Sequence, residues 1–393
     1  MSLFRTTQNL SRPCTLGLDI GRCAIKAVLL EEDDRAIHVK RAWCVPTPPD
    51  ALDQGVLLKK REVGELLKKI VRQCEVPLRT ASVSLPMAQA LVRWIDLPRM
   101  DEDALEGAAR FEARKYLPYP AESAEIVMTP MQGGGDSTSE MMKALLTAIP
   151  TEVVTSRAEA LEFAGLGIDF VEIESFPLLR THRELPGPRA GFWRGCSKGF
   201  LMLGEESSSM VIVQGGVPVF VRSFNWGSSR LKELIVEMAG CAPEEAGAIL
   251  ERRDAFVDLG GVFAWGEPSV RRFCEGMAGE LQRLDREIAR LISYYRSLFP
   301  ERSYEGALGA LTLSGGTANL TGLPEYFTQS LQIPTSGGSL KWERFGEVTS
   351  SAESVLTSGA SYSVAAGLAL GALQRLAQTQ ATDGREYVWR RAG

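Results

Sequence analysis

One strand-turn-strand pattern occurs twice in this chain, and this duplication constrains the fold more than any other feature. The first copy is residues 15–21 (TLGLDIG) followed by the apolar run 25–30, and the second opens with residues 199–204 (GFLMLG). When Gly21 is aligned with Gly204, apolar residues fall on apolar residues: Leu18 on Leu201, Ile20 on Leu203 and Val28 on Val211. Internal self-similarity indicates a repeated structural unit. The sequence therefore predicts an α/β protein whose two lobes open with the same strands.

The composition is that of a folded protein and argues against several classes of function. The 393 residues suffice for two or three domains, and 45% apolar with 24% charged residues is typical of chains that bury a core. The formal net charge of -5 argues against a broad nucleic-acid surface. Only two histidines are present, so a multi-histidine metal site has few candidates.

The seven cysteines and the hydrophobic runs bear on the cellular compartment. No Cys-x-x-Cys pair occurs, which argues against a thiolate zinc site and a disulfide framework. No apolar run is long enough to span a bilayer, and residues 1–13 lack the apolar stretch of a secretion signal. We therefore expect a cytoplasmic protein with reduced cysteines.

Strand and helix patterns along the chain predict three units. Residues 14–86 and 167–190 form the first lobe, and residues 87–166 form a small inserted α+β unit. Residues 198–385 form the second lobe, in which 229–300 is mostly helical. The Pro- and Gly-rich segment between the lobes is the expected boundary.

Two glycine-containing turns after apolar strands are suited to nucleotide phosphates. At Asp19 and Gly21, glycine lets backbone amides approach an oxyanion while the carboxylate can hold hydrated Mg²⁺. Gly315 and Gly316 follow a second apolar strand and lead towards a helix, where backbone donors are free. Either turn alone is compatible with an ordinary structural turn. Their occurrence together, in two repeated lobes, favours a nucleotide site.

Five segments carry a resemblance to a known family: residues 16–28 (LGLDIGRCAIKAV), 96–101 (DLPRMD), 111–120 (FEARKYLPYP), 313–323 (LSGGTANLTGL) and 363–370 (SVAAGLAL). The chain resembles the PilM family of type IV pilus assembly, itself similar to FtsA and to the ATPase fold of actin, Hsp70 and sugar kinases. The discriminating piece is residues 111–120, which lie in the inserted unit that sets PilM and FtsA apart. The resemblance implies a two-lobed actin-like ATPase fold with duplicated ribonuclease H-like lobes.

The resemblance also implies ATP or ADP with Mg²⁺ as cofactor and a set of nucleotide-binding residues. Asp19, which holds the metal through a bound water, flanks the phosphates with Gly21 and Lys26. The full expected set is Asp19, Gly21, Lys26, Gly204, Ser207, Glu287, Arg290, Gly315 and Gly316. Two alternatives stay open: Lys26 as a solvated hairpin lysine, and Glu287 with Arg290 as an ordinary salt bridge along one helix.

This sequence departs from the family pattern in both hairpins. Arg22, Cys23 and Ala24 replace the Ser-rich turn, and Met202 stands where the second lobe normally carries an Asp that faces magnesium or the attacking water. A thioether cannot ligate magnesium or orient water. Glu205 and Glu206 follow Met202 and could substitute only by reaching in; a solvated turn is the plainer reading. We therefore expect slow or absent hydrolysis.

The resemblance further implies capture of the N-terminal tail of a PilN-like inner-membrane protein. The expected groove between the first lobe and the inserted unit is lined by Leu91, Trp94, Tyr116, Leu117 and Tyr119, which could instead be core residues. The chain would then sit at the inner face of the inner membrane through its partner. We also expect contacts with other pilus assembly proteins and self-association of the chain into a ring. Nucleic acid binding and direct membrane insertion are not expected.

These observations favour a non-catalytic scaffold of the pilus machine that holds ATP with little hydrolysis. The alternative is an active actin-like ATPase whose nucleotide state regulates pilus or type II secretion assembly. A sugar kinase would need a general base at the position of Met202, and an FtsA-like division protein would need a long C-terminal amphipathic helix.

Overall fold

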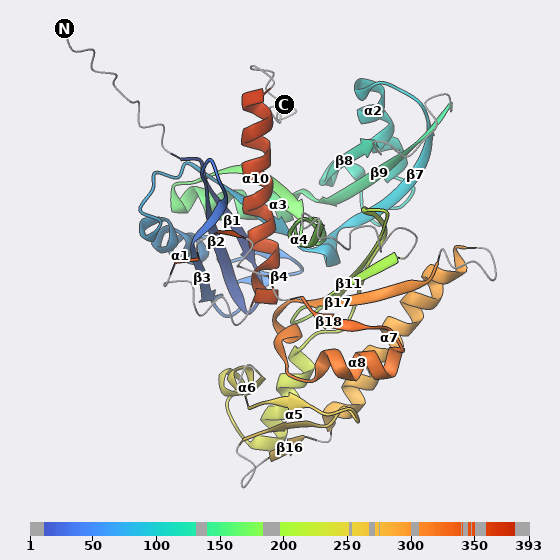
Figure 1. Cartoon of the computed structure of the whole chain (residues 1–393). Helices are drawn as coiled ribbons and strands as arrows, with labels where there is room; N and C mark the ends of the chain where they lie inside the picture. Colours follow the sequence, from blue (N-terminus) through green and yellow to red (C-terminus); the bar gives the residue numbers. More distant parts are fainter. Residues whose placement is uncertain are drawn as a thin grey trace.

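The computed structural model describes residues 12–130, 140–183, 197–250, 254–266, 272–274, 276–299, 306–338, 340, 345–346, 348–349 and 359–381. They form two lobes, each built on a five-stranded sheet, and a smaller unit with a three-stranded sheet (Figure 1). This is the two-lobed α/β architecture predicted from the duplicated strands.

The first-lobe sheet has the strand order β10-β6-β1-β2-β3. Its strands are β1 (Cys14–Ile20), β2 (Ala24–Glu32), β3 (Ile37–Pro46), β6 (Thr80–Leu85) and β10 (Gly167–Ile173). The first three strands form an antiparallel meander, while β6 pairs parallel with both β1 and β10. Side chains alternate between the two faces of a strand, and both faces are covered. Leu16, Leu18 and Ile20 pack under α1 (Lys60–Gln73) and α3 (Thr151–Ala164).

The second-lobe sheet repeats this topology with the order β13-β12-β11-β17-β18. Its strands are β11 (Ser197–Leu203), β12 (Ser208–Gln214), β13 (Val217–Phe224), β17 (Leu308–Ser314) and β18 (Thr335–Gly337). Again a meander is followed by parallel pairs. Leu201 and Leu203, the predicted equivalents of Leu18 and Ile20, face the second-lobe core. The duplication is confirmed.

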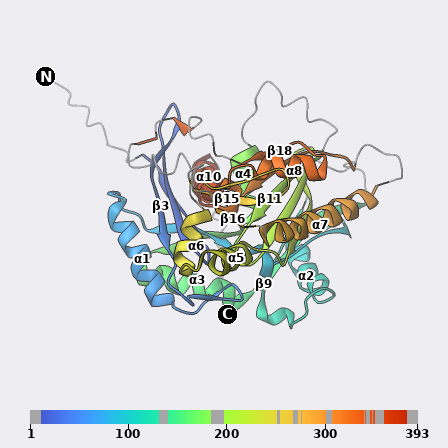
Figure 2. The same ribbon diagram turned by 90° about the horizontal axis from the view of Figure 1, so that it is seen from below.

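Helices cover one face of the second-lobe sheet (Figure 2). Helices α7 (Gly276–Ser297) and α8 (Leu323–Leu331) pack on the sheet, and α5 (Ser229–Ala239) and α6 (Pro243–Leu250) pack together in the same core. Apolar residues of α7 recur at helical spacing and face the core: Met277, Leu281, Leu284, Ile288, Leu291, Ile292 and Tyr295. The range expected to be mostly helical also contains a small antiparallel sheet of β14 (Phe256–Val257), β15 (Phe263–Trp265) and β16 (Arg272–Cys274).

The small unit has its own core. Strands β7 (Leu91–Pro98), β9 (Met141–Pro150) and β8 (Ala124–Pro130) pack against α2 (Glu102–Ala113). The carboxylate of Asp101 accepts a hydrogen bond from the Ala104 amide (2.9 Å) and so caps α2. Leu97, Leu105 and Leu146 are buried between the sheet and this helix.

Two helices pack in a different lobe from the one that the predicted boundaries gave them. Helix α3, within the range 87–166 of the inserted unit, shares the first-lobe core with α1. Helix α10 (Ser363–Ala381), within the range 198–385 of the second lobe, lies on the first-lobe sheet (Figure 1). Small residues permit this contact, because a Cβ on Gly17 would lie only 2.0 Å from the carbonyl oxygen of Ala365.

A shared apolar cluster, which we call the interlobe core, joins all three units. Val92 and Ile149 come from the small unit, and Phe200 and Val211 come from the second lobe. The first lobe and the helices α4 (Ser175–Arg183) and α10 contribute Leu85, Phe170, Ile173, Leu178, Leu179, Val364, Leu368 and Ala372. Burial of this apolar surface favours the lobes staying together.

Candidate functional site

The first-lobe half of the predicted site lies where three parallel strands end. Asp19 is near the end of β1, Ser84 near the end of β6, and Glu174 directly follows β10. The Ser84 hydroxyl donates to Asp19 Oδ1 at 2.8 Å. Lys26 lies opposite Asp19 in the antiparallel β1–β2 ladder, so the two side chains share one face of the hairpin. The structure thus places Asp19 and Lys26 side by side, while their contact with a nucleotide stays a prediction.

Two further ionisable residues lie close enough to Asp19 to interact with it electrostatically, the half-buried Glu174 and the buried Arg157. Glu174 Oε1 accepts a hydrogen bond from the Met87 amide at 3.0 Å. Burial, reinforced by the negative charge of Asp19, raises the pKa of Glu174 to about 7. Arg157 donates to the carbonyl oxygens of Ser84 (3.0 Å), Gly55 (2.8 Å) and Val153 (2.7 Å), while burial lowers its pKa to about 10.

Sequence reasoning missed both of these residues, although each left a signal. Glu174 ends the run 167–174 (GIDFVEIE), and a charged residue at the carboxyl end of a buried parallel strand is often placed in a site. Arg157 is spaced four residues from Val153 and three from Ala160, which puts it on the buried face of α3.

The second-lobe half differs chemically from the first. Met202 lies opposite Ser209 in the β11–β12 ladder and packs against the interlobe core. The Ser208 hydroxyl donates to the carbonyl of Trp226 at 2.8 Å. A Cβ on Gly204 would lie 2.4 Å from the carbonyl oxygen of Ser207, so these two predicted residues face each other across a tight turn.

Four side chains of the two hairpin turns and one side chain of α5 join the lobes directly. We call this set the interlobe latch: Arg22, Cys23, Glu205 and Glu206 of the turns, and Lys232 of α5. Arg22 Nη1 and Glu206 Oε1 form an ion pair of 2.9 Å. Lys232 Nζ lies 2.8 Å from Glu205 Oε1 and donates to Cys23 Sγ at 3.0 Å. The Cys23 thiol in turn donates to Glu205 Oε2. Glu205 and Glu206 therefore point at the first-lobe turn.

The Gly315–Gly316 turn ends β17 beside β11. Gly315 has a positive φ of 88°, and a Cβ there would lie 2.3 Å from the carbonyl oxygen of Leu203. A Cβ on Gly316 would meet no atom within 4 Å. The Ser314 hydroxyl donates to the Ala360 carbonyl at 3.1 Å, which ties this turn to the segment before α10. Gly315 is thus fixed by packing, while Gly316 faces open space.

Glu287 and Arg290 hydrogen-bond each other along α7. Arg290 Nη2 donates to Glu287 Oε2 at 2.8 Å, an i,i+3 pair with both side chains exposed. Their neighbours Leu284 and Ile288 face the opposite way, into the second-lobe core. The two side chains therefore form the salt bridge along one helix that the sequence left as the alternative to nucleotide binding.

The five residues predicted to bind a partner do not share one environment. Leu91 and Leu117 pack on the core of the small unit. Trp94 donates its indole N–H to the Pro218 carbonyl of the second lobe at 2.7 Å. Tyr116 is 38% exposed, with the Arg93 guanidinium 4.3 Å from its ring centroid. Burial raises the pKa of Tyr119. Of the five, Tyr116 presents the largest surface suited to a partner.

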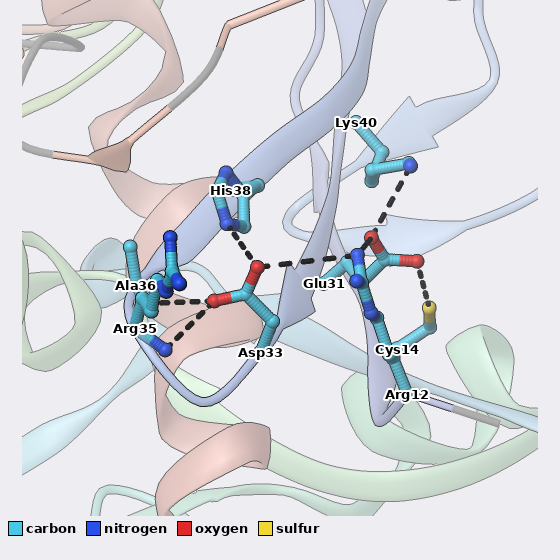
Figure 3. Close-up of polar contacts among 8 residues, drawn as sticks. All are labelled: Arg12, Cys14, Glu31, Asp33, Arg35, Ala36, His38 and Lys40. Atoms are coloured by element: carbon cyan, nitrogen blue, oxygen red, sulfur yellow. Dashed lines mark hydrogen bonds and ion pairs between the residues drawn. The ribbon is translucent and has the colours of Figure 1, made fainter. Parts of the chain in front are cut away.

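A separate polar pocket of about 110 Å³ lies at the other end of the first-lobe hairpins (Figure 3). Glu31 pairs with Lys40 (3.2 Å) and Arg12 (3.5 Å), and Asp33 contacts His38 Nε2 at 3.0 Å. Hydrogen bonds from the Arg35 and Ala36 amides lower the pKa of Asp33 to about 2. The charges of this pocket are thus paired among its own residues, which is the pattern of a structural network.

The described part of the chain lacks both a metal cluster and a membrane-spanning helix. In those residues no group of three or more His, Cys, Asp or Glu side chains is arranged to hold a metal ion. Over the same ranges, no helix combines the length and the apolar character needed to cross a bilayer.

Solved structures define the fold class. A chain of the PilM-PilN type IV pilus biogenesis complex is similar with a TM-score of 0.75 and 23% identity, over 91% of this chain and 98% of that chain. The ethanolamine utilization protein EutJ from Carboxydothermus hydrogenoformans has a TM-score of 0.51 and 12% identity, over 92% and 90%. MreB5 of Spiroplasma citri bound to ADP has a TM-score of 0.51 and 11% identity, over 95% and 99%. The chain therefore has a two-lobed actin-like fold.

A family model narrows this class. The model of the type IV pilus assembly protein PilM matches residues 17–373. Because this match spans most of the chain, the chain belongs to the PilM family of type IV pilus assembly proteins.

Of the two halves of the predicted nucleotide site, only the first-lobe half fits a nucleotide with magnesium. In the first lobe, Asp19 and Lys26 present a carboxylate and a cation on one hairpin face, as such a ligand requires. In the second lobe, Met202 supplies no oxygen, and the carboxylates of Glu205 and Glu206 are directed at the first-lobe turn. Both carboxylates are already paired with the cations of Arg22 and Lys232, so the second-lobe half of the site does not match ATP with magnesium.

Proposed function

We propose that this chain is a non-catalytic scaffold of type IV pilus assembly that captures the N-terminal tail of a PilN-like inner-membrane protein. The observation that carries the proposal is membership of the PilM family over residues 17–373. The similar chain of known structure comes from a complex with PilN, which supports the choice of partner. Capture of such a tail would hold the chain at the inner face of the inner membrane.

The small unit offers the surface for this capture. Phe111 and Tyr116 lie at the end of α2 and are 62% and 38% exposed. Each has a cation beside it, with Lys115 Nζ 4.8 Å from the Phe111 ring centroid and Arg93 by Tyr116. Exposed aromatic rings with neighbouring cations are typical anchors in peptide recognition. We assign tail capture to this aromatic surface.

The test is a binding titration with the N-terminal segment of the PilN-like protein from the same organism. We expect saturable binding to the full chain, and a loss of at least about tenfold in affinity for Tyr116→Ala, since a buried aromatic anchor contributes 1 to 2 kcal/mol or more. Tyr294→Ala is the matched control, because Tyr294 is 49% exposed on α7, in the other lobe. Equal losses for both variants would overturn the assigned surface.

A second candidate, an active ATPase, is favoured by the first-lobe half of the site. Asp19, Lys26 and the half-buried carboxyl of Glu174 are the groups that such an enzyme would use to position magnesium and water. This candidate predicts magnesium-dependent turnover that Asp19→Ala abolishes. A turnover assay therefore separates the two functions.

A further inference from the structure

Carbonyl oxygens of the two hairpin turns accept hydrogen bonds from backbone amides outside the turns. The amides of Ser228 and Ser229, at the start of α5, donate to the carbonyls of Gly204 and Glu205, both at 3.0 Å. In the first lobe, the Thr47 amide donates to the Cys23 carbonyl at 3.0 Å. A helix N-terminus and a glycine turn are the usual donors for a phosphate. Here the first amides of α5 donate to the second-lobe hairpin instead.

The charges of the latch also balance without a ligand. Arg22 and Lys232 supply two cations, and Glu205 and Glu206 supply two carboxylates. Burial opposes ionisation of Glu205, but hydrogen bonds from Cys23 and Lys232 lower its pKa overall. Burial and the Glu205 hydrogen bond raise the pKa of Cys23 to about 11, so this side chain is a neutral thiol that can donate.

We propose that the interlobe latch takes the place of nucleotide phosphates in this chain, and that it holds the two lobes closed without ATP. In a nucleotide-dependent two-lobed protein, the ligand bridges the two hairpins and its binding closes the lobes. Here Arg22 and Cys23 of the first-lobe turn reach Glu206 and Glu205 of the second-lobe turn directly. Closure is then an intrinsic property of the chain.

The latch works together with the interlobe core. That core joins the lobes by apolar contacts on one side of the sheets, including Phe200 and Leu368. The latch joins them at the hairpin turns, where the Lys232 and Glu205 side chains are only 23% and 21% exposed. Two separate attachments restrict rotation of one lobe against the other far more than either alone. This inference does not depend on tail capture.

Hydrogen exchange across the lobes tests the latch. We expect Glu205→Gln, a second-lobe change, to speed exchange of the first-lobe Thr47 amide by about three- to tenfold, since a partly exposed charged hydrogen bond is lost. Lys232→Met should act in the same direction and gives a second, independent variant should one of them fold poorly. A purely local role would leave Thr47 unchanged, and that result would overturn the latch.

A matched control lies on the same helix as Lys232. Glu233 pairs with Arg230 at 2.7 Å, an exposed ion pair that stays within α5. Glu233→Gln should therefore leave exchange at Thr47 as in the native chain. An equal acceleration by Glu233→Gln would mean that the effect reports general loosening of the second lobe, and it would contradict the proposal.

The second arm is a titration of the full native chain with ATP and MgCl₂, followed by thermal unfolding. We expect no shift of the unfolding temperature at millimolar ATP, because the latch occupies the position of the phosphates. A saturable rise that Asp19→Ala removes would overturn the proposal. Tail capture, measured separately, is unaffected by either result, so failure of the latch and failure of the proposed function are distinguishable.

Discussion

Asp19 and Met202 occupy equivalent positions in the hairpins of the two lobes. Asp19 lies opposite Lys26 in the β1–β2 ladder, and Met202 lies opposite Ser209 in the β11–β12 ladder. The duplicated fold thus places one carboxylate and one thioether where an actin-like ATPase has two carboxylates. The two hairpins share one backbone arrangement, and the side chains at this position differ in chemistry.

The half-buried carboxyl of Glu174 predicts a specific pH dependence of stability. Its pKa is about 7 in the folded chain against an ordinary value of 4.5, so its contribution to stability is fully present below pH 4.5 and is lost as the pH rises through 7. Relative to the native chain, Glu174→Gln should therefore gain on the order of 1 to 3 kcal/mol between pH 4.5 and 8.

Denaturant unfolding of both proteins at several pH values measures this difference. Other titrating groups are common to both chains and cancel when the two curves are subtracted. A difference that stays constant from pH 4.5 to 8 would show that Glu174 is not held in the buried, poorly ionised state.

The contact between β1 and α10 predicts that Gly17 tolerates no side chain. A Cβ there would lie 2.0 Å from the Ala365 carbonyl oxygen and 2.7 Å from the Ala369 amide nitrogen, and backbone atoms cannot move aside cheaply. We expect Gly17→Ala to lower the free energy of unfolding by about 1 to 3 kcal/mol or more.

Gly279→Ala is the matched control for this change. A Cβ on Gly279 meets no atom within 4 Å, and the residue lies inside α7, so alanine there should be neutral or stabilising by up to about 1 kcal/mol. If both variants melt at the native temperature, α10 does not pack on β1 as described.

Trp94 has a structural role that a simple substitution can isolate. Its indole N–H donates to the Pro218 carbonyl and so connects the small unit to β13. Trp94→Phe keeps the ring but removes the donor, and should lower the free energy of unfolding by about 1 kcal/mol. Thermal unfolding measures the loss, and the tail titration should show unchanged affinity. A large loss of tail affinity with unchanged stability would instead assign Trp94 to the partner surface.

Features of the fold that follow from short sequence patterns could be predicted, whereas features that depend on contacts between distant segments could not. The repeated hairpins were predictable, because period-2 alternation places Leu18 and Leu201 on core faces whatever packs there. The lobe of α10 was not, since its Ala- and Gly-rich sequence suits close packing on either sheet. Only the three-dimensional contact at Gly17 decides the lobe.

The residues of the candidate site also differ in whether the sequence alone could reveal them. Asp19 was visible from its glycine-containing turn, and the resemblance to the PilM family implied Lys26. Alignment of one half of the chain with the other then placed Met202 opposite Asp19. The pairing of Arg22 with Glu206 was not visible, because it joins residues from different lobes. Burial of Arg157 and Glu174 likewise depends on strands and helices that meet only in the folded chain.

The most direct test of the account is a titration of the full chain with the PilN-like N-terminal segment, carried out with and without ATP and magnesium. The account predicts saturable binding with the same affinity in both conditions, because the chain is a scaffold whose lobes are closed by their own side chains. Absence of binding, or binding only when ATP is present, would contradict it.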